Sequence, residues 1–514
     1  MGIPTYFKHI FFKYNDILQN KIEKEIDNFY MDLNCLIHPC SKEKNTDEEV
    51  INNVIKTMDI IINNVKPKKK LFIAIDGVCP MSKIITQRKR RLKSVYDKNE
   101  LIEIYKKHNK ELPKWDSINI SPGTEFMKKL NNEIKIYLDK LKKILNINII
   151  FSSSDIYEEG EQKIIKDIRK NKLNEINSIY GLDSDLIILS LIEHREIYLY
   201  REKIEFISYY NVVYENFVYL SIDKLKTYIY KDIDKKEKFI KENIIIDYIF
   251  LSFFIGNDFI PQLPSIKIRN NGINILLEEY KKLLLKYEKY LVINSKNGSI
   301  NKYFLYNLLK NLSIKEDNLL KEIHKNYVYN SNIKINKSED LFMNDIKNME
   351  IIDKTQIKNV IEFNKIGYKK RYYKCYFNLD KNENLENYFN ELNKICFNYI
   401  ESLKWTLLYY TNNNIPSYNW YYKYNTSPFI IDIYNYIKYN NDVFNKIIFK
   451  QGKKLKPLEQ LTLIVPKEKN YLIPLEYKKY IEKYINYYDY TIDYQYKLFK
   501  HESIILIDYI NLFN

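Results

Sequence analysis

Short apolar runs that end in a carboxylate recur in the first half of this 514-residue chain. Each run suits a buried strand or a helix end that delivers a negative charge to the tip of the element. Several such tips in one fold predict a single acidic pocket, because gathered carboxylates repel one another unless a cation neutralises them. The runs are FYMD, LFIAID, YGLDSD and FFIGND, which end at Asp32, Asp76, Asp183 with Asp185, and Asp258.

Two further acids, Glu159 and Glu161, flank Gly160 with the same i, i+2 spacing as Asp183 and Asp185. In an extended segment, side chains two residues apart point the same way. The glutamates also lead into a helical pattern, and a helix N-terminus favours nearby negative charge. Carboxylate oxygens favour Mg²⁺ or Mn²⁺. All seven acids are therefore candidate metal ligands.

Predicted strands alternate with predicted helices between residues 28 and 200. This order is typical of parallel βαβ units, so we expect an α/β fold with a mainly parallel, twisted sheet flanked by helices. Functional groups of such sheets gather at the carboxyl ends of the strands. We expect strands at 28–33, 71–75, 147–152, 186–190 and 197–200, and helices at 5–12, 47–64, 81–95, 121–144 and 161–169.

The chain is longer than one hydrophobic core usually supports, so two or more subdomains are expected. Residues 275–365 are rich in Lys, Asn and Glu and show few strand signals, which indicates a variable helical connector. The pattern returns near Tyr368, with an apolar, aromatic helix at 400–410. Three regions are therefore predicted, at 1–274, 275–365 and 366–514.

The chain carries 82 Lys and Arg against 66 Asp and Glu, which gives a net charge of +16. Such a surplus points to polyanions, and first to nucleic acid. Lys, Asn, Ile and Tyr are over-used throughout, so many lysines are expected on an ordinary solvated surface. A sharper signal comes from the helix after Asp76, where four side chains fall within an arc of roughly 100° and suit a terminal phosphate: Lys83, Gln87, Arg90 and Arg91.

The order of the motifs resembles the XRN-type 5′→3′ exoribonuclease family. The resemblance covers nearly the whole chain apart from residues 275–365. In the first half it rests on MGIPTYF (1–7), DNFYMDLNCLIHPC (27–40), IDGVCPMSKIITQRKRR (75–91), SPGTEFM (121–127), EEGEQK (158–163), YGLDSDLIILSL (180–191) and GNDFIPQLPS (256–265). In the second half it rests on YIESLKWTLLYY (399–410), YNWYY (418–422) and KPLEQLTLIVP (456–466).

The resemblance implies a PIN/FEN-like nuclease core in residues 1–274 and a mostly helical second conserved region, 366–514, that packs on this core. It implies a base-stacking pair at His38 and Trp420, with Tyr418 at the neighbouring family tryptophan position. It places the 5′-phosphate pocket on Lys83, Gln87, Arg90 and Arg91. It assigns catalysis and metal binding to Asp32, Asp76, Glu159, Glu161, Asp183, Asp185 and Asp258.

The activity that the resemblance implies is processive 5′→3′ degradation of 5′-monophosphorylated single-stranded RNA to 5′-mononucleotides. Hydrolysis would use two Mg²⁺ ions, about 4 Å apart, for which Mn²⁺ could substitute. Base stacking on the aromatic side chains would need no sequence code, because every base has a π-face. Two alternatives stay open: a structure-specific 5′ nuclease that acts on DNA flaps, and an inactive RNA-binding scaffold.

Several candidate residues also have an ordinary structural interpretation. Asp183 and Asp185 could cap a helix. His38 could be a structural histidine, and Trp420 could belong to the core. The basic face of the helix after Asp76 could be a solvated surface.

Four residues near the predicted pocket carry further expectations. The family usually has a smaller residue at Glu158 and a His at Gln162, and neither difference replaces a proposed ligand. The extra charge of Glu158 is expected to affect metal affinity. Cys35 and Cys79 are expected to be small packing residues.

Cysteine usage and hydropathy limit the cellular compartment in which we expect the protein. Five cysteines without paired metal spacing fit a reducing, intracellular environment, and we expect the cytoplasm in preference to the nucleus. The basic KPKKK stretch at 66–70 directly precedes a predicted strand, so we interpret it as a surface turn. No apolar run is long enough to cross a bilayer. We expect a monomer with RNA as its partner and no membrane association.

Overall fold

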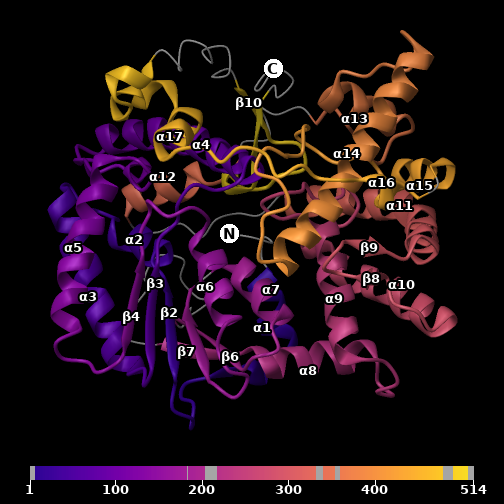
Figure 1. Ribbon diagram of the computed structural model, residues 1–514. Helices are drawn as coiled ribbons and strands as arrows, with labels where there is room; N and C mark the ends of the chain where they lie inside the picture. Colours follow the sequence, from indigo (N-terminus) through magenta and orange to yellow (C-terminus); the bar gives the residue numbers. More distant parts are fainter. Residues whose placement is uncertain are drawn as a thin grey trace.

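The computed structural model describes residues 6–181, 183–202, 217–331, 340–352, 359–440, 442–478 and 490–507. Within these ranges a seven-stranded sheet forms the centre of the first half (Figure 1). Its five adjacent parallel strands lie in the order β6-β5-β2-β3-β4, and β7 and then β1 extend it antiparallel at the β6 edge. The strands are β1 (Leu18–Gln19), β2 (Asn28–Asp32), β3 (Lys70–Ala74), β4 (Asn148–Ser152), β5 (Asn177–Tyr180), β6 (Ile197–Glu202) and β7 (Phe217–Ser221).

Helices cover both faces of this sheet (Figure 1). Phe29 and Met31 of β2 pack with α2 (Asn34–Cys40), α3 (Asp47–Val65) and α5 (Glu125–Leu141). Tyr30 points to the other face and packs with α6 (Gly160–Ile168) and α7 (Ser184–Ile192). Side chains alternate between the faces along a strand, so a strand buried on both faces is apolar almost throughout, as parallel sheets require.

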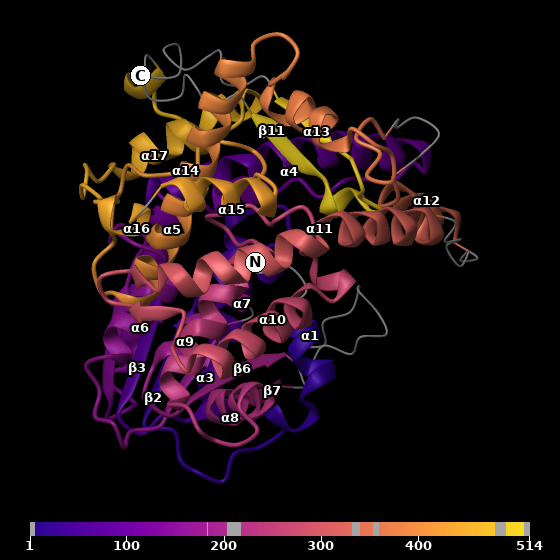
Figure 2. The same ribbon diagram turned by 90° about the vertical axis from the view of Figure 1, so that its right-hand side faces the viewer.

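The second half is mostly helical and surrounds α4 (Met81–Lys107), a long helix that leaves the sheet after β3. The helix α17 (Pro457–Ile464) and the strand β11 (Ile504–Ile507) pack along α4. Figure 2 shows β11 beside α4. Ile84 and Leu92 of α4 share one hydrophobic cluster with Leu461 and Ile505. The bounds are α9 (Lys241–Ser252), α10 (Gly272–Tyr287), β8 (Val292–Asn294), β9 (Ser299–Ile300), α11 (Lys302–Asn330), α12 (Leu341–Met349), α13 (Tyr368–Phe377), α14 (Leu385–Thr411), α15 (Ile430–Tyr439), α16 (Val443–Lys446), α17 (Pro457–Ile464), β10 (Tyr490–Asp493) and β11 (Ile504–Ile507).

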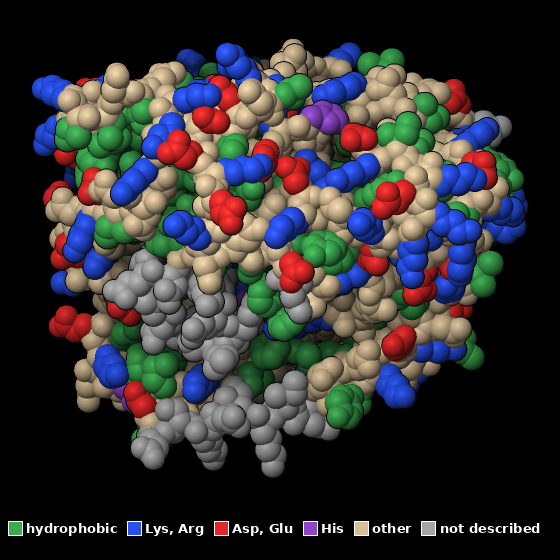
Figure 3. Space-filling model, turned by 90° about the horizontal axis from the view of Figure 1, so that it is seen from below, with side chains coloured by type: hydrophobic (Ala, Val, Ile, Leu, Met, Phe, Trp, Pro, Cys, Tyr) green, Lys and Arg blue, Asp and Glu red, His purple; other side chains and the backbone are tan. Residues whose placement is uncertain are grey.

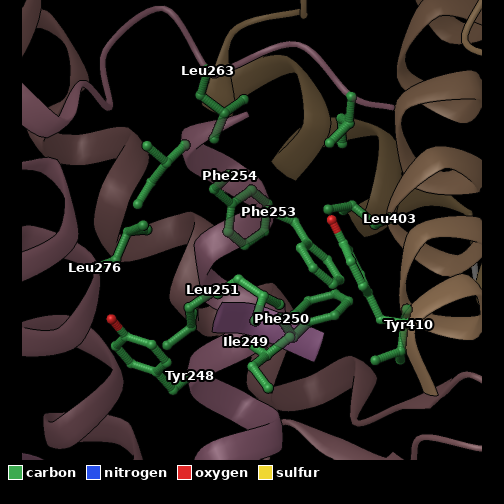
Figure 4. Close-up of a cluster of buried hydrophobic side chains, with 14 of the residues drawn as sticks. Tyr248, Ile249, Phe250, Leu251, Phe253, Phe254, Leu263, Leu276, Leu403 and Tyr410 are labelled. Atoms are coloured by element: carbon green, nitrogen blue, oxygen red, sulfur yellow. The ribbon is translucent and has the colours of Figure 1, made fainter. Parts of the chain in front are cut away.

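The two halves share a hydrophobic core. In Figure 4, Tyr410 of α14 points toward Phe250 and Phe253, which lie at the end of α9 and just after it. The rings of Phe253 and Tyr410 stack with their centroids 5.7 Å apart. Trp405 of α14 is fully buried in the same cluster. Burial of large aromatic side chains from both halves fixes α14 against the first half of the chain.

The expected fold class, a mainly parallel α/β sheet with a helical second region, is confirmed. One predicted strand was wrong: residues 186–190 belong to the helix α7. The run SDLIILSLI is almost entirely buried and apolar on every side, so it has no helical period that could distinguish it from a buried strand. The strand that precedes it, β5, was missed.

The boundaries of other predicted elements differ less from those in the structure. The predicted helix at 81–95 continues to Lys107, and the helix expected from 121 begins at Glu125 with Thr124 as its N-cap and ends at Leu141. Residues 66–70 form the expected turn before β3, starting with Lys66 in the left-handed region. Residues 1–5 of the first predicted helix and motif lie outside the described ranges.

The predicted three-region division stays a prediction. Within 275–365, α11 packs closely against α15, so this stretch contributes to the core of the second half. Lys and Arg are spread among Asp and Glu on the face shown in Figure 3, as expected for a solvated surface. Across the described ranges, none of the helices combines the length and the apolar character that a membrane crossing needs.

Candidate active site

Four adjacent strands deliver the predicted acids to one edge of the sheet. Asp32 is the last residue of β2, and Asp76 follows β3 by two residues. After β4 the chain reaches Glu159, the N-cap of α6, and after β5 it reaches Asp183, the N-cap of α7. Glu161 and Asp185 lie in the first turns of these two helices, and Asp258 enters from the loop after α9.

Gly160 shows how closely Asp32 and Asp76 approach. Its backbone N–H donates to Asp76 Oδ1 over 2.7 Å. A Cβ atom added to Gly160 would lie 2.9 Å from Asp32 Oδ1 and 3.4 Å from Asp76 Oδ1. Asn34 fixes the other oxygen of Asp76, because its Nδ2 donates to Asp76 Oδ2 over 2.9 Å. The glycine therefore leaves the space in which these two carboxylates meet.

The ammonium of Lys83 lies among the remaining acids. Its Nζ is 2.6 Å from Glu159 Oε1, 2.8 Å from Asp258 Oδ2 and 4.0 Å from Asp185 Oδ2. Arg90 also binds Asp258, with 2.6 Å between Nη2 and Oδ1. The predicted phosphate-binding helix thus faces the acid cluster directly, and two of its cations already neutralise part of it.

Burial and mutual repulsion set the proton affinities in this cluster. Burial together with the charge of Asp76 raises the pKa of Asp32 to about 7. Burial raises the pKa of Glu161 well above its usual value, and it also raises the pKa of Asp185 and Glu159. The pKa of Asp258 is instead lowered, since Lys83 and Arg90 outweigh its burial. Lys83 and Arg90 compensate the charge of Asp258, whereas the raised pKa values of Asp32, Glu161 and Asp185 mean that these carboxylates favour an added positive charge.

The donor set fits a hard divalent cation. Asp32 Oδ1, Glu161 Oε1 and Asp185 Oδ2 are buried oxygens without a hydrogen-bond donor, and such oxygens suit Mg²⁺. Across the described part of the chain, no three His, Cys, Asp or Glu side chains already stand together as a metal-ligand group. Lys83 lies between three of the carboxylates, and its charge takes the place that a cation would otherwise fill. Lys83 bridges Glu159 and Asp258 in this structure, and the role of the acids as metal ligands stays a prediction.

Asp183 has the structural role that the sequence left open. Its side chain accepts a 3.5 Å hydrogen bond from the backbone N–H of Asp185 and caps α7. Asp183 is only partly buried. Its role as a metal ligand stays a prediction.

The other two predicted phosphate-binding residues lie at the rim. Arg91 donates from Nη2 to Ser121 Oγ over 2.7 Å, and Gln87 Oε1 accepts from Gln460 Nε2 over 3.3 Å. Burial lowers the pKa of Arg91 to about 10, which keeps it charged at neutral pH. Ser121 thus links the SPGTE motif to this rim, and Gln460 links α17 to it.

The predicted stacking residues are not equally placed. His38 lies near the end of α2 and keeps part of its surface exposed. Its pKa is lowered to about 4, because the surrounding protein desolvates it and Arg91 and Arg90 are nearby. Trp420 stacks on Trp405 at 5.2 Å and packs against the main core. The structure gives no contact between Trp420 and His38, so this pair stays a prediction.

Tyr418 contacts the start of the cationic helix α4. Its carbonyl oxygen accepts from the backbone N–H of Met81, the first residue of α4, over 2.8 Å. Lys454 lies over the rings of both Tyr418 and Tyr157, at 5.0 and 5.1 Å. Tyr157 precedes the EEGEQK motif, so these rings lie beside the segment that carries Glu159.

Two tyrosines of α14 were not singled out from the sequence. Tyr409 donates to Glu159 Oε2 over 2.6 Å, and Tyr410 donates to Asp185 Oδ1 over 3.0 Å. Both side chains are buried. They belong to the motif YIESLKWTLLYY, but nothing in that segment indicates that its hydroxyls reach acids more than 200 residues away.

Comparison with known proteins places the chain. The family described as the XRN 5′-3′ exonuclease N-terminus matches residues 1–203, and the Xrn1 helical domain matches residues 238–358 and 312–511. The chain belongs to the XRN family. This confirms the resemblance that the motifs indicated.

Curated relatives are longer than this chain. The 5′-3′ exoribonuclease 1 of Saccharomyces cerevisiae is 34% identical over 335 residues, which cover 59% of this chain and 22% of the yeast protein. The human 5′-3′ exoribonuclease 1 is 28% identical over 584 aligned residues, which cover 99% of this chain and 33% of the human protein. The chain therefore spans about a fifth to a third of the length of these two relatives.

A solved structure of a bacteriophage T5 flap endonuclease, in complex with DNA and metal ions, covers 63% of this chain and is itself 97% covered. The sequence identity is 11% and the TM-score is 0.26. A likeness at this level carries no argument about the site.

Proposed function

We propose that this chain is a processive 5′→3′ exoribonuclease that degrades 5′-monophosphorylated single-stranded RNA to 5′-mononucleotides with two Mg²⁺ ions. The observation that carries the proposal is the direct apposition of the acidic sheet edge and the cationic face of α4, which meet at Lys83, Arg90 and Asp258. Family membership supports the same activity.

Seven carboxylates would hold the cations: Asp32, Asp76, Glu159, Glu161, Asp183, Asp185 and Asp258. Divalent cations bound there would activate a water molecule and stabilise the charge that develops on the scissile phosphate. Asn34 and Tyr409 orient Asp76 and Glu159 through the hydrogen bonds described above. Fixed orientation of each carboxylate limits the reorganisation that the reaction requires.

The RNA terminus would bind along α4. Once the acids are neutralised, the ammonium of Lys83 is no longer held by Glu159 and Asp258, and it becomes available to the 5′-phosphate. Arg91 and Gln87 complete a donor set that is enclosed by Ser121 and Gln460. A monophosphate matches this compact set, whereas a triphosphate adds bulk and charge.

The test follows the degradation of one RNA with a 5′-monophosphate, 5′-hydroxyl or 5′-triphosphate end, with Mg²⁺ or with a chelator. We expect mononucleotides from the monophosphate RNA only, and only with Mg²⁺. Asp183→Ala with Asp185→Ala should abolish the activity. A protein that cleaves a DNA flap faster than this RNA would instead support the flap-nuclease alternative, and RNA binding without degradation would support the scaffold.

The phosphate pocket has its own test. Arg90→Ala with Arg91→Ala should reduce the preference for monophosphate over hydroxyl ends by about tenfold or more, since each charge-assisted contact contributes roughly 1.5–3 kcal/mol. Lys106→Ala with Lys107→Ala, at the far end of the same helix, is the control for charge. Equal losses on both substrates in the arginine variant would indicate general RNA affinity instead.

A further inference from the structure

A cavity of about 260 Å³ lies beside α4, on the face that points away from Gln87 and Arg91 of the predicted phosphate pocket. Ser82, Ile85 and Lys89 line it. At 100° per residue, they project about half a turn away from Gln87 and Arg91. The loop that carries Asp258 separates the two sites, since Asp258 lines the cavity and also binds Arg90.

The walls of this cavity are rich in aromatic rings. Six tyrosines line it, from α13, from the segment after Trp420 and from the segment after β10: Tyr372, Tyr376, Tyr421, Tyr422, Tyr424 and Tyr496. Aromatic rings in such number bind flat, conjugated ligands, because rings stack or meet edge to face. Nucleobases are ligands of this shape.

The charges of the cavity favour an anion. Lys89, Lys267 and Lys497 line it together with Asp258 and Asp493. Asp258 is neutralised from the other side by Lys83 and Arg90. Asp493 accepts hydrogen bonds from Tyr376 and from the backbone N–H of Gln495, at 2.8 and 3.0 Å. The ammonium groups therefore outweigh the available negative charge.

Burial makes the charged form of two of these lysines, Lys89 and Lys267, unfavourable. It lowers the pKa of Lys89 to about 7, and burial together with Lys497 lowers the pKa of Lys267 to about 7. An anion placed beside them would restore their usual charge state and recover that cost. Such an arrangement is typical of a site that is completed by a ligand.

Two polar groups in the wall, from Ser82 and Asn257, lack a hydrogen-bond partner. Ser82 Oγ, in a side chain that is 4% exposed, has no hydrogen-bond partner, and neither does Asn257 Nδ2. Both residues line the cavity. A few unsatisfied polar groups in a mostly aromatic pocket are what orients a small ligand.

The cavity has additional room beyond Lys267. A neighbouring hollow of about 420 Å³ is lined by Gln262, Lys267, Tyr496, Lys497 and Ile504, all of which also line the first cavity. The two hollows therefore meet at a wall that carries two lysines. A flat group in the aromatic chamber could extend an anionic group to this wall.

We propose that this cavity is a second nucleotide site, which binds one nucleoside monophosphate with its base among the tyrosines and its phosphate beside Lys89 and Lys267. The size of the aromatic chamber suits one base and not a chain of stacked bases. The proposal does not depend on the nuclease assignment, because the lining of the cavity shares only Asp258 with the seven acids, and Lys83 and Arg90 hold that carboxylate from the other side.

The test is equilibrium dialysis of labelled adenosine 5′-monophosphate (AMP) against the whole chain, without divalent metal. AMP could also enter the predicted terminal-phosphate pocket, so the measurement is made in the variant Gln87→Ala with Arg91→Ala, which keeps Arg90 on Asp258. We expect this variant to keep saturable binding of one AMP. Adding Lys267→Met or Lys89→Met should weaken that binding at least tenfold, while Lys267→Arg keeps it within about threefold. Lys106→Met is the control for loss of a lysine elsewhere on α4.

The ligand class is tested with parts of the probe. Adenosine and inorganic phosphate should each bind at least tenfold more weakly than AMP. The proposal is overturned if AMP binding is lost in the variant Gln87→Ala with Arg91→Ala, or if the binding in that variant is insensitive to Lys267→Met. It is also overturned if a short RNA without a 5′-phosphate displaces AMP from that variant, because the cavity would then belong to the RNA path. Unfolding midpoints of all variants show whether each loss of binding reflects the site or the fold.

Discussion

The hydroxyl of Tyr409 lies 2.6 Å from Glu159 Oε2 and donates a hydrogen bond to it across the boundary between the two halves of the chain. Lys83 holds the other oxygen of the same carboxylate. The orientation of Glu159 is therefore set by one group from α4 and one from α14. The helical half of the protein acts on the acidic site through direct contact, in addition to covering it.

Tyr409→Phe should lower the rate of RNA degradation by about 10- to 100-fold, the usual effect of removing a group that orients a metal-binding residue. The Mg²⁺ concentration needed for half-maximal rate should rise in parallel, because Glu159 loses its fixed position. The measurement is the initial rate on 5′-monophosphorylated RNA as a function of Mg²⁺.

Tyr399→Phe is the matched control for this change. Tyr399 lies in the same helix, is fully buried, and its hydroxyl has no hydrogen-bond partner. Its loss should leave the rate and the Mg²⁺ dependence unchanged. Equal effects of the two substitutions would show that Tyr409 acts only through packing.

Gly160→Ala should inactivate the site while leaving the fold intact. The new methyl group would lie 2.9 Å from Asp32 Oδ1, so Asp32 must move away from Asp76. Activity should fall at least about 100-fold, since displacements of this order disrupt catalytic geometry. Glu125→Ala is the control, because Glu125 is also the first residue of a helix but is exposed. An active Gly160→Ala enzyme would contradict the proposed pairing of Asp32 with Asp76.

The acidic edge was largely predictable from the sequence. Asp32 and Asp76 follow strands that are apolar on both faces, and the carboxyl ends of adjacent parallel strands lie at one edge. The helix α7 was not predictable in the same way, because its central run, residues 186–189, is apolar throughout and fits a buried strand equally well. The error moved Asp185 from a turn before a predicted strand to the first turn of a helix but left its location at the edge unchanged.

The contacts made by the second half were not predictable. Tyr409 and Tyr410 are separated from the acids that they contact by 250 and 225 residues in the sequence. A local sequence pattern cannot predict contacts over such a separation. The sequence also predicted the role of Lys83 only in part. Helical spacing shows which residues share one side of a helix but not which groups that side contacts. Only the tertiary structure shows that Lys83 binds the acids themselves.

Glu158 has an unusual backbone conformation for a residue with a side chain, with φ at 87°. Glycine adopts this region at little cost, whereas alanine does not. Glu158→Gly should therefore be more stable than Glu158→Ala by about 1 kcal/mol, although both lose the ion pair with Lys166. Urea unfolding of the two variants measures the difference. At Glu125, in an ordinary helical conformation, alanine should be the more stable of the two.

Glu316 should make the stability of the fold depend on pH. This fully buried carboxyl of α11 accepts hydrogen bonds from Ser265 and from the backbone N–H groups of Ile430 and Ile431, which begin α15. Burial nevertheless raises its pKa to about 7, from a usual value of 4.5. The folded state then binds more protons than the unfolded state between these two values.

The sign of the effect follows from this proton difference. The contribution of Glu316 is fully present below about pH 4.5 and is lost as the pH rises through 7, which amounts to roughly 3 kcal/mol at about 1.4 kcal/mol per pH unit. Urea unfolding from pH 5 to pH 8 should show the free energy of unfolding falling more steeply in the natural protein than in Glu316→Gln, which has no carboxyl to titrate. The variant should also be less stable at pH 5, because its amide replaces one of the two accepting oxygens. Parallel pH profiles for the two proteins would mean that the carboxyl stays ionised in the fold and that its hydrogen bonds fully offset its burial.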